Sequence, residues 1–62
     1  MDREVIFEFL PVGNFVKVTA LDVETRIEVS TITPRSLNQG EQERAALNKL
    51  IYVMGKKMDI EP

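Results

Sequence analysis

The chain has 62 residues, of which 44% are hydrophobic and 29% are charged, and its eight basic and ten acidic side chains give a net charge of -2 at pH 7. This composition is typical of a folded globular domain and excludes a disordered tail or a fibrous repeat. Histidine and cysteine are both absent, which removes the common proton shuttles, thiol nucleophiles, disulfides and soft metal ligands. We therefore expect a protein that is not an enzyme and that holds no metal and no cofactor.

A chain of this length forms one small domain, which we place at residues 1–62, and it buries only about 60% of its unfolded surface. Because neither disulfides nor zinc can add stability, self-association is the default expectation. No stretch has the features of a signal peptide or a membrane span, so we expect a cytoplasmic protein that does not enter a membrane.

The first half of the chain predicts a β-hairpin. Two runs rich in β-branched and aromatic residues, about 4–11 and 15–22, flank the pair Gly13-Asn14, which suits the positive φ angles of a two-residue turn. Val12 then lies opposite Phe15, and alternate residues point to opposite faces. One face is uncharged and carries Val5, Phe7, Phe9, Val16, Val18 and Ala20. The other face is mixed and carries Ile6, Glu8, Leu10, Val12, Phe15, Lys17, Thr19 and Leu21.

A second turn is predicted at 22–26, because the Asp22 side chain can accept a hydrogen bond from the backbone two residues on. Pairing Asp22 with Ile27 extends the uncharged face into a third strand at about 26–33. Arg26 then closes the loop at a position where the left-handed conformation is common. We therefore predict a positive φ at Arg26, with a small local strain that glycine would relieve.

The last third of the chain predicts one amphipathic helix at about 39–57. Asn38 and Glu41 have the spacing of a capping box at its start. Gly55 either ends the helix or lies inside it, so the predicted end lies between residues 54 and 58. The apolar stripe recurs at helical spacing. It consists of Ala46, Leu47, Leu50, Ile51, Val53, Met54 and Met58.

These elements predict the α+β class, as a three-stranded antiparallel meander with one C-terminal amphipathic helix packed on its uncharged face. The mixed face is then left without the helix, and exposed apolar patches and free strand edges commonly mark protein contacts. Tyr52, on the polar side of the helix, also suits a contact. The alternative is that terminal residues, including Ile60, fold over part of this face. The predicted interaction surface consists of Ile6, Leu10, Val12, Phe15, Lys17, Leu21, Ile32 and Tyr52.

We therefore expect a protein–protein interaction or homodimerisation module, whose partner is another protein or a second copy. A nucleic-acid-binding sheet is an alternative by fold analogy, but Lys17 is opposed on its face by Glu8 and Glu28. A non-catalytic enzyme subunit, contributing Lys17, Arg44 or Tyr52 across an interface, is a further alternative. A small-molecule site is not expected, because a chain this small offers little room for a pocket.

The segment from Glu4 to Lys57 also carries a resemblance. Three runs of residues carry this resemblance, namely Gly-Asn-Phe-Val-Lys-Val-Thr-Ala, Asp-Val-Glu-Thr and Arg-Ala-Ala-Leu-Asn-Lys-Leu-Ile-Tyr-Val. With these runs the chain resembles a group of short, uncharacterised bacterial proteins of strand-strand-strand-helix form. The resemblance implies the same fold and no assigned activity, cofactor or catalytic residue. Arg26 stands where such hairpins often have glycine.

Overall fold

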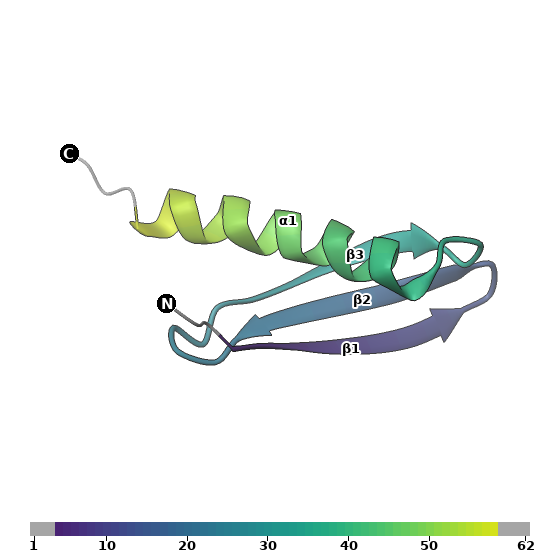
Figure 1. Ribbon diagram of the computed structural model, residues 1–62, viewed down its shortest axis with the longest axis horizontal. Helices are drawn as coiled ribbons and strands as arrows, with labels where there is room; N and C mark the ends of the chain where they lie inside the picture. Colours follow the sequence, from purple (N-terminus) through teal and green to yellow (C-terminus); the bar gives the residue numbers. More distant parts are fainter. Residues whose placement is uncertain (1–3, 59–62) are drawn as a thin grey trace.

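The computed structural model of the protein describes residues 4–58. It contains three strands and one helix, which are β1 (Val5–Val12), β2 (Phe15–Asp22), β3 (Glu28–Pro34) and α1 (Gln39–Met58). The strands form one antiparallel sheet of order β1-β2-β3, and α1 lies across one of its faces (Figure 1). The predicted α+β class and the meander followed by one helix are therefore confirmed.

The hairpin between β1 and β2 has the predicted two-residue turn. Gly13 has a φ of 60°, and Val12 pairs with Phe15 in the register that the alternation predicts. Arg35, which follows β3, holds this turn from the side. Its backbone N–H donates to the Asn14 carbonyl at 2.9 Å, and its guanidinium donates to the Gly13 carbonyl at 3.1 Å. These bonds tie the hairpin to the chain that leads into the helix.

The turn between β2 and β3 is built on Asp22, whose side chain is buried. The Asp22 carboxylate accepts hydrogen bonds from the Thr25 backbone at 2.9 Å and from the Thr25 hydroxyl at 2.7 Å. Arg26 has a φ of 65°, which confirms the predicted left-handed conformation. The predicted start of the third strand at residue 26 is wrong, because Arg26 and Ile27 belong to the turn and β3 begins at Glu28.

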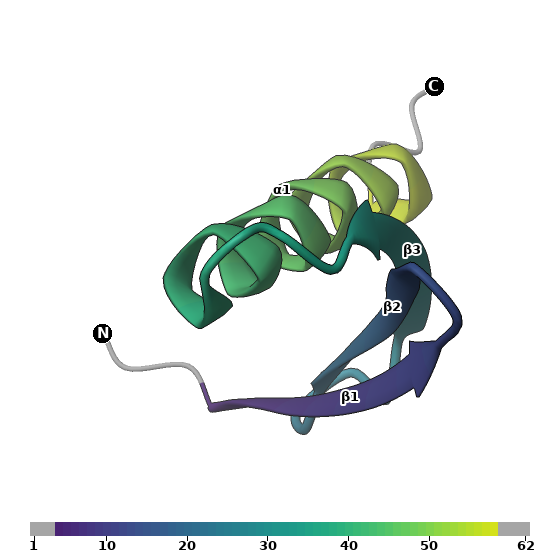
Figure 2. The same ribbon diagram turned by 90° about the vertical axis from the view of Figure 1, so that its right-hand side faces the viewer.

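The core lies between α1 and the inner face of the sheet. Its buried apolar side chains are Val16, Val18, Ala20, Val29, Ala46, Leu50 and Met54. The helix packs on β2 and β3, and Figure 2 shows β1 at the margin of this contact. Phe7 and Phe9 point to the inner face as predicted, but they are only half-buried because the helix does not centre on β1.

The start of α1 has the predicted capping box. The Asn38 side-chain oxygen accepts from the Glu41 backbone N–H at 2.8 Å, and the Glu41 carboxylate accepts from the Asn38 backbone N–H at 3.3 Å. These two bonds satisfy amide groups that a helix N-terminus leaves unpaired. At the other end, Gly55 lies inside the helix, which ends at Met58.

One member of the predicted apolar stripe is misplaced. Ile51 is 59% exposed, so its assignment to the buried stripe is wrong. The reason is geometric: Ile51 lies about 100° around the helix from the buried Leu50, beyond the arc that faces β2 and β3. The side chain of Met58, also assigned to the stripe, and the whole of Ile60 lie outside the described part of the structure.

Candidate interaction surface

The face of the sheet opposite α1, here called the helix-free face, is arranged in four rows across the strands. The register places one residue of each strand in each row. In order from the β1–β2 turn, the rows are Val12, Phe15 and Pro34; Leu10, Lys17 and Ile32; Glu8, Thr19 and Ser30; and Ile6, Leu21 and Glu28. The face therefore has an apolar end next to the turn, a polar band, and a mixed end.

The apolar end is the most exposed hydrophobic region on this face. We define the hairpin-end patch as Leu10, Val12, Phe15 and Ile32, whose exposed fractions lie between 52% and 60%. Pro34 continues the patch on β3 and is also exposed. The sequence prediction missed Pro34, although its place after Thr33 in the alternating pattern puts it on this face. Single exposed apolar residues are ordinary, but a contiguous cluster commonly marks an interaction site.

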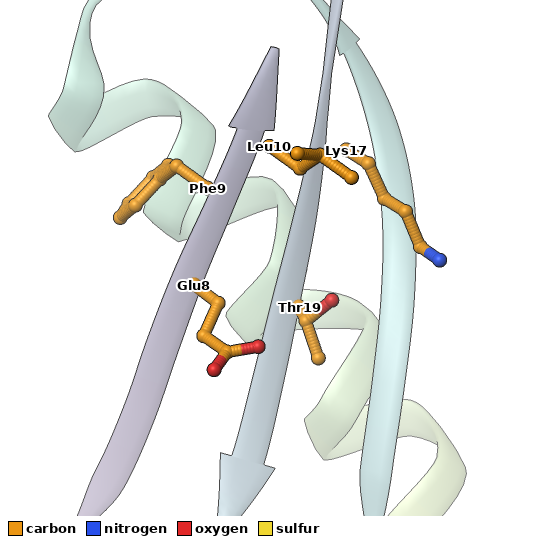
Figure 3. Close-up of a pocket in the computed structure, with 5 residues that line it drawn as sticks. All are labelled: Glu8, Phe9, Leu10, Lys17 and Thr19. Atoms are coloured by element: carbon orange, nitrogen blue, oxygen red, sulfur yellow. The ribbon is translucent and has the colours of Figure 1, made fainter. Parts of the chain in front are cut away.

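The hairpin-end patch surrounds one charged residue, Lys17. Figure 3 shows the Lys17 side chain extending across β3 and the Glu8 carboxylate pointing toward β2. A hollow of about 430 Å³ lies here, lined by Glu8, Phe9, Leu10, Lys17 and Thr19. Its volume exceeds what we expected for so small a chain, yet it is walled only by neighbouring strands. We interpret it as a trough in the surface.

The polar band below the patch is held in place by a hydrogen bond between the hydroxyls of Thr19 and Ser30, at 3.0 Å. Beyond it, Ile6 is 46% exposed and Leu21 is half-buried. The seven predicted sheet residues of the interaction surface therefore do share one face. They lie at both of its ends, with the polar band between them.

Tyr52 does not join this face. It is exposed on α1, which covers the opposite side of the sheet, and the Lys56 ammonium lies 5.7 Å from the centre of its ring. Its predicted place on the polar side of the helix is confirmed, and a contact role for Tyr52 stays a prediction. A helix residue on the solvent side cannot reach the far face of the sheet that the helix covers.

The described residues offer little for other kinds of site. Between residues 4 and 58, no three carboxylates lie close enough together to hold a metal ion. In the same part of the chain, α1 is too polar to cross a membrane. Among hydroxyl groups, that of Thr33 donates to the Val16 carbonyl at 3.4 Å and that of Thr25 binds Asp22. Both hydroxyls therefore have structural roles.

Comparisons with known proteins identify the family to which this chain belongs. Neither the curated proteins nor the solved structures that were searched gave a match. A family described as "Domain of unknown function (DUF6898)" matches residues 2–57, nearly the same segment as the one that carried the resemblance. The strand-strand-strand-helix form of that resemblance is also the fold described above. The chain therefore belongs to the DUF6898 family, a family of unknown function.

Proposed function

We propose that this protein is a small self-association module in which the helix-free faces of two copies pack against each other. The observation that carries the proposal is the hairpin-end patch, where four large apolar side chains each leave more than half of their surface in water. The helix is committed to the other face. In this proposal the protein has no catalytic role.

The position of Lys17 favours one orientation of the two faces. Packing patch directly on patch would bring two Lys17 ammonium groups together, and like charges oppose association. A two-fold axis that runs across the strands instead sets the hairpin-end patch against the opposite end of the partner. Phe15 then lies over the partner's Leu21, and Lys17 lies near the partner's Glu8. In this arrangement Val12 and Phe15 meet apolar side chains of the partner and Lys17 meets an opposite charge, whereas Leu10 and Ile32 lie over the partner's polar band.

The strength of this contact follows from the exposed fractions. Fully burying a side chain of this size stabilises by about 1.5–3 kcal/mol, so covering the exposed half contributes about 1 kcal/mol. Four patch residues on each of two copies then contribute at most about 8 kcal/mol. Association itself costs roughly 4–15 kcal/mol. We therefore expect a weak dimer, which requires measurement at protein concentrations up to about 1 mM.

The test is light scattering coupled to size exclusion over a concentration series. The double variant Leu10→Thr with Phe15→Thr keeps β-forming side chains but removes apolar area from the patch. The matched control is Ile51→Gln with Tyr52→Gln, which removes equally exposed apolar area from α1. We expect the patch variant to have half the mass of the native protein at high concentration, and the control to match the native protein. An unchanged mass for a folded patch variant would contradict the proposal.

Nucleic-acid binding has weaker support from the same face. In the described strands, Lys17 is the one basic side chain on the helix-free face, and Glu8 and Glu28 lie on the same face. Phosphate contacts need clustered positive charge. The observed distribution of charge supports a protein partner over a nucleic acid.

A further inference from the structure

The two outer edges of the sheet differ in what they offer to another strand. Val12 and Phe15 close the two-residue hairpin as a hydrogen-bonded pair, and the Val23 backbone still donates to the Glu4 carbonyl at 3.1 Å at the other end. Residues at even positions of β1 therefore point their backbone groups at β2. Val5, Phe7 and Phe9 point theirs away from the sheet, along its free edge.

The β3 edge is protected. The same alternation points the backbone groups of Glu28, Ser30 and Ile32 outward. The Lys49 ammonium, from α1, donates to the Ser30 carbonyl at 2.6 Å. Pro34 has no N–H to offer, and Glu28 places a charge at the start of the strand. Charged side chains, proline and a covering helix are the common means by which proteins block an exposed edge.

The β1 edge has much less protection. Between Val5 and Val12, Glu8 is the one charged residue, and Pro11 interrupts the edge only near its end. The helix is also displaced from this side, since it packs on β2 and β3. Lys49 fixes the flank of α1 that faces β3, so Ile51, about 200° around the helix, lies on the flank toward β1. The open edge is therefore long and apolar, and no element between residues 4 and 58 covers it.

We propose that two copies of the chain pair through their β1 strands, antiparallel and in register about a two-fold axis at Phe7. Phe7 then exchanges backbone hydrogen bonds with the partner's Phe7, and Val5 does so with the partner's Phe9. The two three-stranded sheets join into one sheet of six strands. Both helices lie on the same side of it, because the axis runs perpendicular to the sheet.

The identity of the partner strand and the register of the pairing both follow from the sequence of β1. A two-fold axis at Glu8 would set two carboxylates directly opposite each other in a closely spaced pair, which is destabilising. An axis at Phe9 would place Pro11 opposite Phe7, where an N–H is needed. With the axis at Phe7, Glu8 lies opposite the partner's Ile6 and no like charges meet. The edge is thus complementary to a second copy of itself.

This contact uses residues other than the hairpin-end patch and does not depend on the proposed stacking of helix-free faces. Joining two sheets through β1 makes their helix-free faces continuous, so that each stacked layer presents twice the area. Sheets of this kind pack face to face at about 10 Å.

Single cysteines test the register directly, because the native chain has none. Ile6 and the partner's Glu8 form a closely spaced pair with Cα atoms about 4.5 Å apart, within the range that a disulfide spans. Both side chains are exposed on the helix-free face, so Ile6→Cys and Glu8→Cys are expected to fold. The two variants are oxidised separately and as a mixture, and disulfide-linked dimer is measured on non-reducing gels. Glu28→Cys, exposed at the protected edge, is the matched control.

We expect linked dimer in the mixture of Ile6→Cys with Glu8→Cys, and none with either variant alone or with Glu28→Cys mixed with Ile6→Cys. No linkage in the first mixture would refute pairing through β1. Linkage of Glu8→Cys with itself would refute the register. The light-scattering result for Leu10→Thr with Phe15→Thr reports on the stacked faces separately, so failure of either proposal is distinguishable from failure of the other.

Discussion

Leu50 and Ile51 are neighbours on α1 with opposite surroundings, and they make a matched pair for testing where the helix packs. Leu50 is 1% exposed and contacts the core of β2 and β3. Truncating a buried leucine to alanine costs about 2–5 kcal/mol. For a chain of this length the whole free energy of unfolding is about 3–9 kcal/mol. Leu50→Ala therefore removes between about a fifth and the whole of the stability.

Ile51→Ala removes a similar number of carbon atoms at a site where most of the side chain is already in water. Less than half of a burial contribution of about 2 kcal/mol is lost, and the higher helix propensity of alanine offsets about 0.4 kcal/mol of that loss. We expect a change within about 0.5 kcal/mol. If the sequence-based assignment of Ile51 to the buried stripe were right, the two variants would lose similar stability.

The assay is urea denaturation followed by far-ultraviolet circular dichroism. With an m-value of about 1 kcal/mol/M, Leu50→Ala shifts the midpoint down by about 2 M or more, and Ile51→Ala by less than about 0.5 M. Equal shifts for both variants, or a larger shift for Ile51→Ala, would refute the placement of α1 over β2 and β3. If Leu50→Ala is unfolded without urea, Leu50→Val provides the smaller truncation in the same position.

Two further predictions concern local structure. Asn38→Ala removes the acceptor for the Glu41 backbone N–H and is expected to lower the free energy of unfolding by about 1 kcal/mol; Gln39→Ala is the control, and equal losses would argue against the cap. Arg26→Gly relieves a left-handed conformation that costs about 1–2 kcal/mol, partly offset by greater freedom of the unfolded chain. We expect Arg26→Gly to raise the unfolding midpoint in urea. A lower midpoint would contradict the inferred backbone strain at Arg26.

The strands and their register were predictable because two turns fixed them. Gly13-Asn14 sets β1 against β2, and Asp22 sets β2 against β3, so every later pair follows from the two-residue period of a strand. The loop closed by Asp22 and Ile27 also required a left-handed residue, and the structure places Arg26 there. Local chemistry determined these features, and no knowledge of distant contacts was needed.

The position of the helix across the sheet was not predictable in the same way. A 3.6-residue period identifies an apolar arc on α1, but it does not say which strands that arc will cover. Because α1 packs on β2 and β3, Ile51 falls outside the contact and Phe7 and Phe9 remain half-buried at its margin. The bond from Lys49 to Ser30 depends on this same tertiary placement. It therefore left no signal in the sequence.

The proposed contacts and the stability of the chain are thermodynamically linked. In the proposed assembly a second copy binds only the folded protein, so association would stabilise the fold by mass action. At a concentration one hundred times the dissociation constant, this contribution reaches about 2.7 kcal/mol, which is comparable to the expected loss in Leu50→Ala. The core variants therefore need low protein concentration, where association contributes nothing. In a small chain without cysteine or histidine, the contacts proposed through the β1 edge and the hairpin-end patch would supply stabilisation that larger domains obtain from their own cores.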